Sequence, residues 1–492
     1  MAEKNVKRYK LVKHKWPDEI KAQRDRRIKI IAIVFFCIAC FCAGFLVNNF
    51  TSTKVVSEDQ TFAKLSTVYE IMKDKFYFGV DKKDFEETLI DGAISGMVNA
   101  GGDSHTSYMT PKTAKDFTSS MSGSYVGIGI QYYEVGSNTF LVDKVFKNSP
   151  AEEAGIVAGD IIYAVNGTLC ENMDSDEVKE MISGKSGTKV KVEIIHNNEH
   201  VMKEVERREV SKTVTSSLQG DVAIIELSTF ADTSGDEFGN HLKDLSKKAK
   251  SLVIDLRNNG GGYLTAAQQI ASYLLPENSV VFKEKQRNGD IDEYKVLEDT
   301  KRYAFEQIIV LVNEDTASAS EVLAMALKEN LNAKVVGTKT YGKGTIQVPM
   351  PFKDSSQLKY TTAKWLSPNE KSVDKKGITP DVEVNLDPAI TTSSPVLEKD
   401  EVFKADTVNI AAKSVQTYLK FLGYTVDRTD EYFSPASSNA LKAFQKDNGL
   451  EVTGEINEKV ISTLISQASL KWHSDASYDT QLAKAVELAN GK

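Results

Sequence analysis

The fold of this chain is decided by residues 308–347, which read IIVLVNEDTASASEVLAMALKENLNAKVVGTKTYGKGTIQ. The apolar run over Ile308–Val312 predicts a buried strand, and the polar residues after it predict a turn. Small residues then open a helix, in which apolar residues recur from Val322 to Leu327 at helical spacing. A second short strand is predicted over residues 334–336. This order of strand, helix and strand is typical of an α/β fold.

The turn between the first strand and the helix is a candidate catalytic site. Ser318 lies in this turn beside backbone N–H groups that have no partner within the helix, so a nucleophile and an oxyanion site can occur together. Lys343 lies between two glycines downstream, and a tight segment there can bury its amine and lower its pKa from about 10.4. We interpret Ser318 as the nucleophile and Lys343 as its base. Ser320 is the competing nucleophile, and helix capping by either serine is the structural alternative.

The motifs TASASE and YGKGTIQ together resemble those of the carboxyl-terminal processing proteases, which are serine peptidases with a Ser–Lys dyad. The resemblance covers residues 58–388. It implies an α/β peptidase core of the crotonase/Clp-like type over residues 209–388, and a glutamine that follows the lysine. Gln347 fills that position, and the resemblance implies that it orients the amine of Lys343.

A second motif, DLRNNGGG at residues 255–262, follows a predicted strand and precedes a predicted helix. Glycines in such a turn can cradle a phosphate, but the motif does not match a P-loop or a dinucleotide-binding fingerprint. The family resemblance implies instead that the amide of Gly262 forms one half of an oxyanion hole. Gly261 is the alternative, and the amide of Ala319 is the other half. A tight turn without any chemistry is the structural alternative.

Composition and cysteine usage narrow the class of protein. The chain has 492 residues, enough for several domains, and a formal net charge of −8. Residues 1–29 hold 11 Lys/Arg and 4 Asp/Glu, so the rest is acidic, which argues against a nucleic-acid partner. Three of the four cysteines lie within residues 37–42, so Cys170 lacks a disulfide partner and no zinc pattern occurs outside that run. We expect no metal and no cofactor.

Residues 30–48 are predicted to be a transmembrane anchor. The run Ile30–Val47 has 18 residues without a charge, and as a helix it is about 27 Å long, close to the thickness of the hydrocarbon core. The basic segment over residues 1–29 precedes it and is therefore expected in the cytoplasm, with the catalytic part outside. A cleavable signal peptide and a lipid-modified cysteine are the alternatives.

Residues 58–118 are expected to be a helical region, because apolar residues recur at spacings of three and four up to residue 100. The family resemblance implies a homodimer through these helices. A polar motif, GGDSHTSYM, follows at residues 101–109. Its histidine, His105, is the candidate base of a Ser–His hydrolase. We interpret it as a loop residue, because Lys343 already supplies a base.

Residues 119–208 resemble a PDZ domain, which is a small β-barrel with helices. The resemblance rests on YVGIGI, predicted to be one strand, and on SPAEEAG and GDIIYAVNG farther along the chain. A PDZ domain binds the C-terminus of a peptide through backbone N–H groups and adds the peptide to its sheet. A β-bulge is the alternative for the two glycines of the strand. The peptide-binding residues that the resemblance implies are Tyr125, Val126, Gly127, Ile128, Gly129 and Ile130.

Residues 403–470 resemble a three-helix peptidoglycan-binding domain, on the motifs YLKFLGY, AFQKDNGL and TGEI. A generic three-helix bundle is the alternative. A polar linker is expected before it over residues 389–402. The tail after it, residues 471–492, carries no motif that we can assign.

Together these features predict a multidomain α/β protein that is a membrane-anchored, extracytoplasmic serine endopeptidase of a bacterium. It is expected to cleave proteins with free C-termini near those ends and to bind peptidoglycan. The alternatives are a catalytically silent PDZ and wall-binding scaffold, an acyl-CoA hydratase-like enzyme on a related core, and a Ser–His hydrolase. Whether the PDZ groove recruits substrate or gates the dyad stays open.

Overall fold

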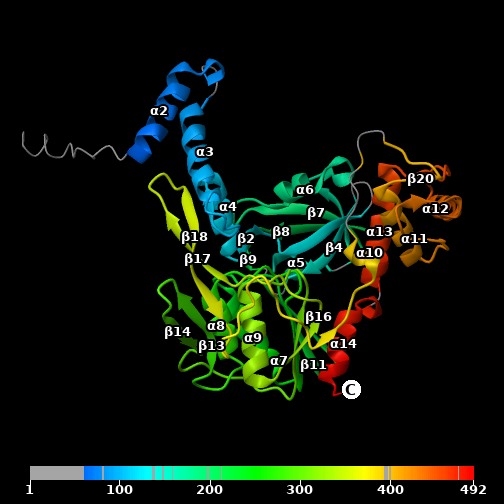
Figure 1. Cartoon of the computed structure of the whole chain (residues 1–492). Helices are drawn as coiled ribbons and strands as arrows, with labels where there is room; N and C mark the ends of the chain where they lie inside the picture. Colours follow the sequence, from blue (N-terminus) through cyan, green and yellow to red (C-terminus); the bar gives the residue numbers. More distant parts are fainter. Residues whose placement is uncertain are drawn as a thin grey trace, which may run out of the picture. The chain divides into compact units, whose positions relative to one another are not determined.

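The computed structural model describes residues 60–79, 83–135, 139–146, 149–157, 159–196, 199–211, 213–392, 397, 401–474 and 476–491 (Figure 1). The chain divides into two compact units, Met1–Gly96 and Met97–Lys492. The anchor predicted over residues 30–48 lies outside the described residues. Within the described ranges, no helix combines the length and the apolar character that crossing a membrane requires.

The described part of the first unit is helical, as predicted. It contains α2 (Gln60–Lys75), the short 3-10 helix η1 (Tyr77–Gly79) and the start of α3 (Phe85–Asn99). The carboxylate of Glu86 on α3 accepts a hydrogen bond from the Tyr69 hydroxyl of α2 at 2.9 Å and pairs with Lys73 at 3.0 Å. These polar contacts join the two helices.

A six-stranded sheet forms the centre of the second unit, and its strand order is β10-β11-β12-β15-β16-β19. Strand β10 is antiparallel to β11, and every later pairing is parallel. The strands are β10 (Val214–Gln219), β11 (Val222–Leu227), β12 (Ser251–Asp255), β15 (Ile308–Val312), β16 (Lys334–Gly337) and β19 (Val382–Glu383). The strand, helix and second strand predicted within residues 308–336 are confirmed. The apolar run of β15 is typical of a strand buried on both faces.

Side chains alternate between the two faces of this sheet, and each face is covered by different helices. Ile254 and Val310 pack with α7 (Ser234–Leu245), α8 (Leu264–Ser272) and α9 (Ala319–Leu331). Val253 and Ile309 point to the other face and pack with α14 (Thr480–Ala489), the red helix beside β11 and β16 in Figure 1. The last helix of the chain therefore covers the second face of the central sheet.

A second, antiparallel sheet has the order β1-β18-β13-β14, with β17 also paired to β18. Its strands are β1 (Ser107–Met109), β13 (Val280–Gln286), β14 (Ile291–Lys295), β17 (Thr345–Pro351) and β18 (Gln357–Leu366). Strand β17 begins directly after the Gly-Lys-Gly motif. It therefore carries Gln347 close to the loop of Lys343.

The module predicted over residues 119–208 contains two antiparallel sheets. Its larger sheet runs β3-β4-β5-β7-β8, with β6 beside β5, and β2 pairs with β9. The strands are β2 (Ser124–Gly127), β3 (Ile130–Val135), β4 (Thr139–Val145), β5 (Ile161–Val165), β6 (Thr168–Leu169), β7 (Lys189–His196), β8 (Glu199–Glu206) and β9 (Arg208–Ser211). The helices in and before this module are α4 (Pro111–Met121), α5 (Pro150–Glu153), the short 3-10 helix η2 (Cys170–Asn172) and α6 (Ser175–Ile182).

The prediction of one continuous strand over residues 125–130 is wrong. The chain leaves β2 after Gly127 and enters β3 at Ile130. Gly129 has a φ of 85°, and a Cβ there would lie 2.2 Å from the Cβ of Ser149. Only glycine fits such a position without strain, and the strand is broken for that reason.

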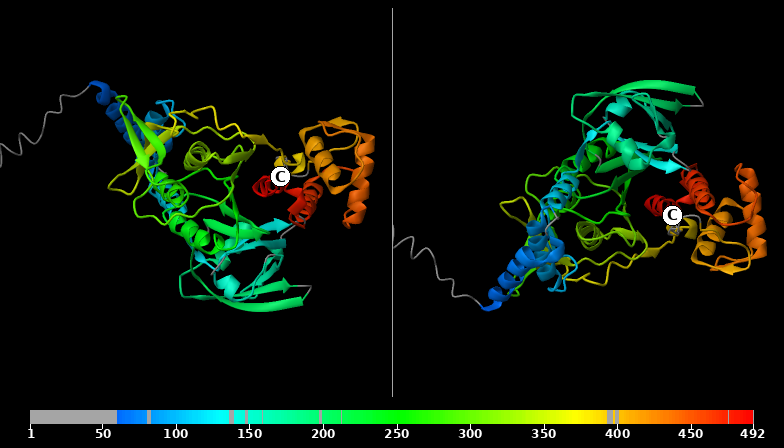
Figure 2. Two further views of the ribbon diagram at one scale, coloured as in Figure 1. Left: turned by 90° about the horizontal axis from the view of Figure 1, so that it is seen from below. Right: turned by 90° about the horizontal axis from the view of Figure 1, so that it is seen from above.

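Three helices form the domain predicted over residues 403–470, and they lie side by side (Figure 2). They are α11 (Ile410–Leu422), α12 (Pro435–Asp447) and α13 (Glu458–Ser474), with the short strands β20 (Thr407–Val408) and β21 (Tyr432–Phe433). Their shared core includes the buried side chains of Leu419, Phe444 and Leu464. The predicted linker is not wholly irregular, because α10 (Pro388–Thr391) forms at its start, capped by Asp387.

Candidate functional site

Ser318 lies on the turn between β15 and α9, where it is the N-cap residue of the helix. Its φ of 57° and ψ of −118° are unusual for a residue with a side chain, a conformation that costs about 1–3 kcal/mol and is typical of functional sites. Its N–H donates to Oε2 of Glu321 at 2.9 Å. The turn is anchored to the end of the neighbouring strand β12, because the Thr316 hydroxyl donates to the carbonyl of Leu256, directly after that strand, at 2.8 Å.

The glycine turn after β12 packs directly against Ser318. A Cβ on Gly261 would lie 2.8 Å from the Cβ of Ser318 and 2.9 Å from the amide nitrogen of Ala319. The N–H of Gly261 already donates to Oδ1 of Asn259 at 2.9 Å. Among the residues that the structure describes, none accepts a hydrogen bond from the N–H of Gly262. The amide of Ala319, the first residue of α9, is also available, because the first N–H groups of a helix have no intrahelical acceptor. This geometry favours Gly262 over Gly261 as the oxyanion donor.

Lys343 is held through its backbone on both sides. Its N–H donates to Oε2 of Glu321 at 2.9 Å, and its carbonyl accepts from Nε1 of Trp365 at 2.8 Å. A Cβ on Gly342 would lie 2.6 Å from another backbone nitrogen, and one on Gly344 would lie 2.5 Å from the Cβ of Asp374. Both glycines are therefore needed for the close approach that fixes the lysine.

Glu321 joins the two halves of the site, and the sequence analysis did not identify it. Its buried carboxylate accepts from the N–H of Ser318, the hydroxyl of Thr340 and the N–H groups of Gly342 and Lys343, at 2.9, 2.5, 2.8 and 2.9 Å. Burial raises the pKa of Glu321, and the four hydrogen bonds oppose that rise. The S-x-x-E spacing of a capping box was the signal that could have revealed it.

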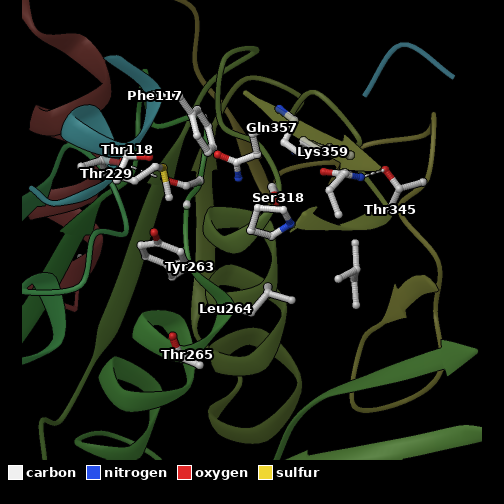
Figure 3. A pocket seen from close by; sticks show the side chains of 18 residues that line it. Phe117, Thr118, Thr229, Tyr263, Leu264, Thr265, Ser318, Thr345, Gln357 and Lys359 are labelled. Carbon is white, nitrogen blue, oxygen red and sulfur yellow. Dashed lines mark hydrogen bonds between the residues drawn. The ribbon is translucent and has the colours of Figure 1, made fainter. Parts of the chain in front are cut away.

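The side chains of Ser318 and Lys343 line one pocket of about 600 Å³, together with Gln347, Gly261 and Gly262 (Figure 3). Burial lowers the pKa of Lys343, and the nearby positive charge of Lys359 lowers it further, against the opposite effect of Asp103 and Glu321. A lowered pKa is what a lysine needs to act as a base near neutral pH. No hydrogen bond joins the Lys343 amine to the Ser318 hydroxyl in the described part of the chain.

The structure brings Gln347 into the pocket but does not join it to Lys343. It lies at an irregularity in the pairing of β17 with β18. Its Nε2 donates to the hydroxyl of Thr345 at 2.8 Å and to that of Thr361 at 3.1 Å. Figure 3 shows the first of these bonds at Thr345. An orienting role for Gln347 stays a prediction.

Ser320 and His105, the alternative nucleophile and the alternative base, do not occupy the positions of the proposed dyad. Ser320 is fully buried, and its hydroxyl donates to the carbonyl of Asn259 at 2.9 Å, so it ties the serine turn to the glycine turn. His105 lies outside the lining of the pocket, with Nδ1 3.3 Å from the Thr345 hydroxyl. Burial lowers the pKa of His105, and the charge of Lys343 adds to the effect.

Comparison with known proteins identifies the family. The chain is 35% identical over 435 residues to "Probable CtpA-like serine protease" of Staphylococcus aureus (strain MRSA252), which covers 88% of this chain and 86% of the relative. The chain belongs to the carboxy-terminal processing proteases of peptidase family S41.

The chain is also similar to other proteins and matches four family models. "Carboxy-terminal processing protease CtpB" of Bacillus subtilis (strain 168) is 35% identical over 440 residues, covering 87% of this chain and 89% of the relative. The solved structure of "photosystem II D1 C-terminal processing protease" shares 27% identity, covers 65% of this chain and 86% of its own, and has a TM-score of 0.39. Family models match as Peptidase family S41 (221–384), PDZ domain (141–195), peptidoglycan binding domain (411–464) and Activating protease CtpB N-terminal domain (47–113).

The PDZ domain of this protease has a groove of about 630 Å³ between the residues predicted to bind peptide and helix α6. Tyr125, Val126, Ile128 and Ile130 line it, and Gly127 and Gly129 belong to the same segment. From the opposite side, α6 contributes Lys179 and Ile182. An apolar groove with a cation at its side can accept an extended peptide with a terminal carboxylate.

Proposed function

We propose that the chain is a serine endopeptidase that cleaves proteins near their C-termini with a Ser318–Lys343 dyad. One observation carries the proposal: the two side chains line the same pocket, and their backbones are joined through the single carboxylate of Glu321. A serine hydroxyl is a weak nucleophile until a base removes its proton. Lys343 is the titratable group of this pocket whose pKa is shifted in the direction that such a base requires.

The chemistry follows from this arrangement. The neutral amine of Lys343 takes the proton of the Ser318 hydroxyl while Oγ attacks the scissile carbonyl carbon. The N–H groups of Gly262 and Ala319 donate to the oxyanion that develops, an interaction worth about 3–4 kcal/mol per donor in comparable sites. The protonated Lys343 then gives its proton to the leaving amine, and an acyl ester remains on Ser318. Water attacks the ester by the same route in reverse, with Lys343 again as the base.

The proposed reaction requires the Ser318 hydroxyl and the Lys343 amine to move into hydrogen-bond distance, because they are not hydrogen-bonded in this structure. Catalytic hydrogen bonds are often long in a free enzyme and shorten when substrate binds. We include in the proposal that the amide of Gln347 turns toward Lys343 in that movement. Substrate in the PDZ groove recruits the cleavable segment or triggers this alignment.

We also propose that the chain is anchored in the membrane and lies at the cell wall. An uncharged run over residues 30–47 behind a basic segment supports a membrane anchor with the catalytic part outside the cell. The peptidoglycan-binding domain supports a position at the bacterial wall. Exposed apolar side chains on the N-terminal helices, such as Phe62 and Val68, support a homodimer through them.

The test compares the purified chain with its Ser318→Ala and Lys343→Ala variants, using an unstructured protein that ends in an apolar residue. We expect cleavage by the wild type and a loss of at least about a thousandfold in each variant. Lys339→Ala is the matched control, because Lys339 is exposed in the same loop, and it should cleave like the wild type. Cleavage by Ser318→Ala at the wild-type rate would refute the dyad. Silence of the folded wild type would favour the PDZ and wall-binding scaffold.

A further inference from the structure

The tail that carries no sequence motif returns to the catalytic core. After β19 the chain builds the three-helix domain and then comes back as α14 on the central sheet. Ala485, Val486 and Ala489 of this helix are buried in one apolar cluster with Val253 and Leu311 of the sheet. The peptidoglycan-binding domain is therefore an insertion in the peptidase fold and is tied to it at both ends.

The first turn of α14 is bonded to the strand end that leads into the glycine turn. The guanidinium of Arg257 donates to both carboxylate oxygens of Asp479 at 2.8 Å and also pairs with Asp255 at 2.6 Å. The side chains of Arg257, Asp255 and Asp479 are only 12, 11 and 16% exposed. A bidentate ion pair of this kind fixes the orientation of the guanidinium as well as its distance from the carboxylate.

The same turn is also hydrogen-bonded to the end of β19, an edge strand of the sheet. Nε2 of Gln481 donates to the carbonyl of Val384 at 2.8 Å, while its Oε1 accepts from Arg257 at 3.2 Å. Asp479 additionally caps α14 by accepting from the N–H of Leu482 at 2.9 Å. One short segment thus holds the edge of the sheet, the start of its own helix and the residue that precedes Asn258–Gly262.

We propose that α14 is an integral part of the peptidase core and that Asp479 is a positioning residue, which acts through Arg257 on the glycine turn. The proposal rests on the oxyanion role given above to Gly262. Asp479 does not line the pocket. Its removal leaves Arg257 paired with Asp255, so the turn loses one anchor without exposing an unpaired buried charge.

The first test is Asp479→Asn in the full chain. Since an oxyanion contact acts in the transition state, kcat should fall by about tenfold while KM stays within about twofold of the wild type. The matched control is Lys484→Ala, which removes only an exposed ion pair with Glu487 on the same helix and should leave both parameters unchanged. A wild-type kcat for Asp479→Asn, or a change confined to KM, would overturn the proposal.

Amide hydrogen exchange separates this proposal from the dyad. Asp479→Asn should speed exchange at residues 258–262, and Lys484→Ala should not, whether or not the wild type cleaves the chosen substrate. Unchanged exchange in Asp479→Asn would refute the positioning role. The dyad, by contrast, is tested only by the activities of Ser318→Ala and Lys343→Ala.

A pair of deletions tests whether α14 belongs to the core. In one variant a glycine–serine linker replaces residues 403–474, so α14 is kept; in the other the chain ends at residue 402. We expect the first to be folded and active. The second should expose the apolar sheet face, lose activity, and regain it when a synthetic peptide of residues 476–491 is added. Equal activity of the two deletions without peptide would contradict the proposal.

Discussion

The two sides of the catalytic pocket are held in different ways. On one side, backbone hydrogen bonds to the buried Glu321 carboxylate join the turn of Ser318 to the loop of Lys343. On the other side, Gln347 is held by two threonine hydroxyls, and one side-chain rotation can exchange those bonds for others. The difference teaches that the backbones carrying Ser318 and Lys343 are fixed relative to each other, whereas the side-chain amide of Gln347 is adjustable. The predictions below test each side of that contrast.

Apart from replacement of Ser318 or Lys343 themselves, the largest effect is expected when Glu321 is replaced by glutamine. One oxygen of the carboxylate becomes an NH2 group, so at least one of the N–H groups that the carboxylate served faces another donor, and each buried donor left unsatisfied costs about 1–3 kcal/mol. We expect kcat to fall by at least about a hundredfold and the free energy of unfolding to fall by several kcal/mol. Peptidase kinetics and urea denaturation measure the two. Glu314→Gln on the nearby exposed turn is the control, with a change below about 0.5 kcal/mol.

The base should reveal itself in the pH dependence of kcat/KM. In the proposed dyad Lys343 works as a neutral amine, so activity should rise as pH increases through its pKa, which burial and Lys359 hold below the ordinary lysine value. Lys359→Met removes a like charge, so the pKa of Lys343 should rise and the midpoint should move to higher pH. His105, Asp103 and Glu321 also face the amine and are unchanged in this variant. Lys353→Met, exposed on the neighbouring hairpin, should leave the midpoint in place, and a downward shift in Lys359→Met would contradict the assignment.

Substitutions on the Gln347 side of the pocket should change kcat less than replacement of Glu321. Gln347→Ala should lower kcat about tenfold if the amide orients Lys343 during reaction. Thr361→Val removes one of the two hydroxyls that hold Gln347 away from the amine, so it should shift the population toward the aligned site and raise kcat severalfold. Steady-state kinetics check both. A loss of activity in Thr361→Val equal to that in Gln347→Ala would show that Thr361 supports the active arrangement instead.

The smallest effect on activity is expected for Ser320→Ala. Its hydroxyl only ties the two turns together, so we expect a loss of about 1 kcal/mol in stability and less than about a threefold loss in kcat. Thermal unfolding and the peptidase assay are the measurements. A loss of activity as large as that of Ser318→Ala would indicate that Ser320, rather than Ser318, could be the nucleophile.

The strands and the glycine turn could be predicted because their signals are local. Apolar runs such as Ile308–Val312 identify buried strands, and the paired serine and lysine motifs predict the candidate dyad. The local S-x-x-E spacing marks Glu321 only as a capping residue, and its bonds to Gly342 and Lys343 come from a later loop. Asp479 pairs with Arg257, which lies far away in the sequence. The break at Gly129 was missed because a positive φ is set by the approach of Ser149, which no periodicity reveals.

The most direct test of the central claim is labelling with a fluorophosphonate, which reacts with an activated serine. Wild type, Lys343→Ala and Ser320→Ala would be treated across pH 6–10, and the modified peptide identified by mass spectrometry. We predict labelling at Ser318 in the wild type and in Ser320→Ala, rising with pH through the lowered pKa of Lys343, and none in Lys343→Ala. Labelling of Ser318 at the wild-type rate without Lys343 would contradict the account.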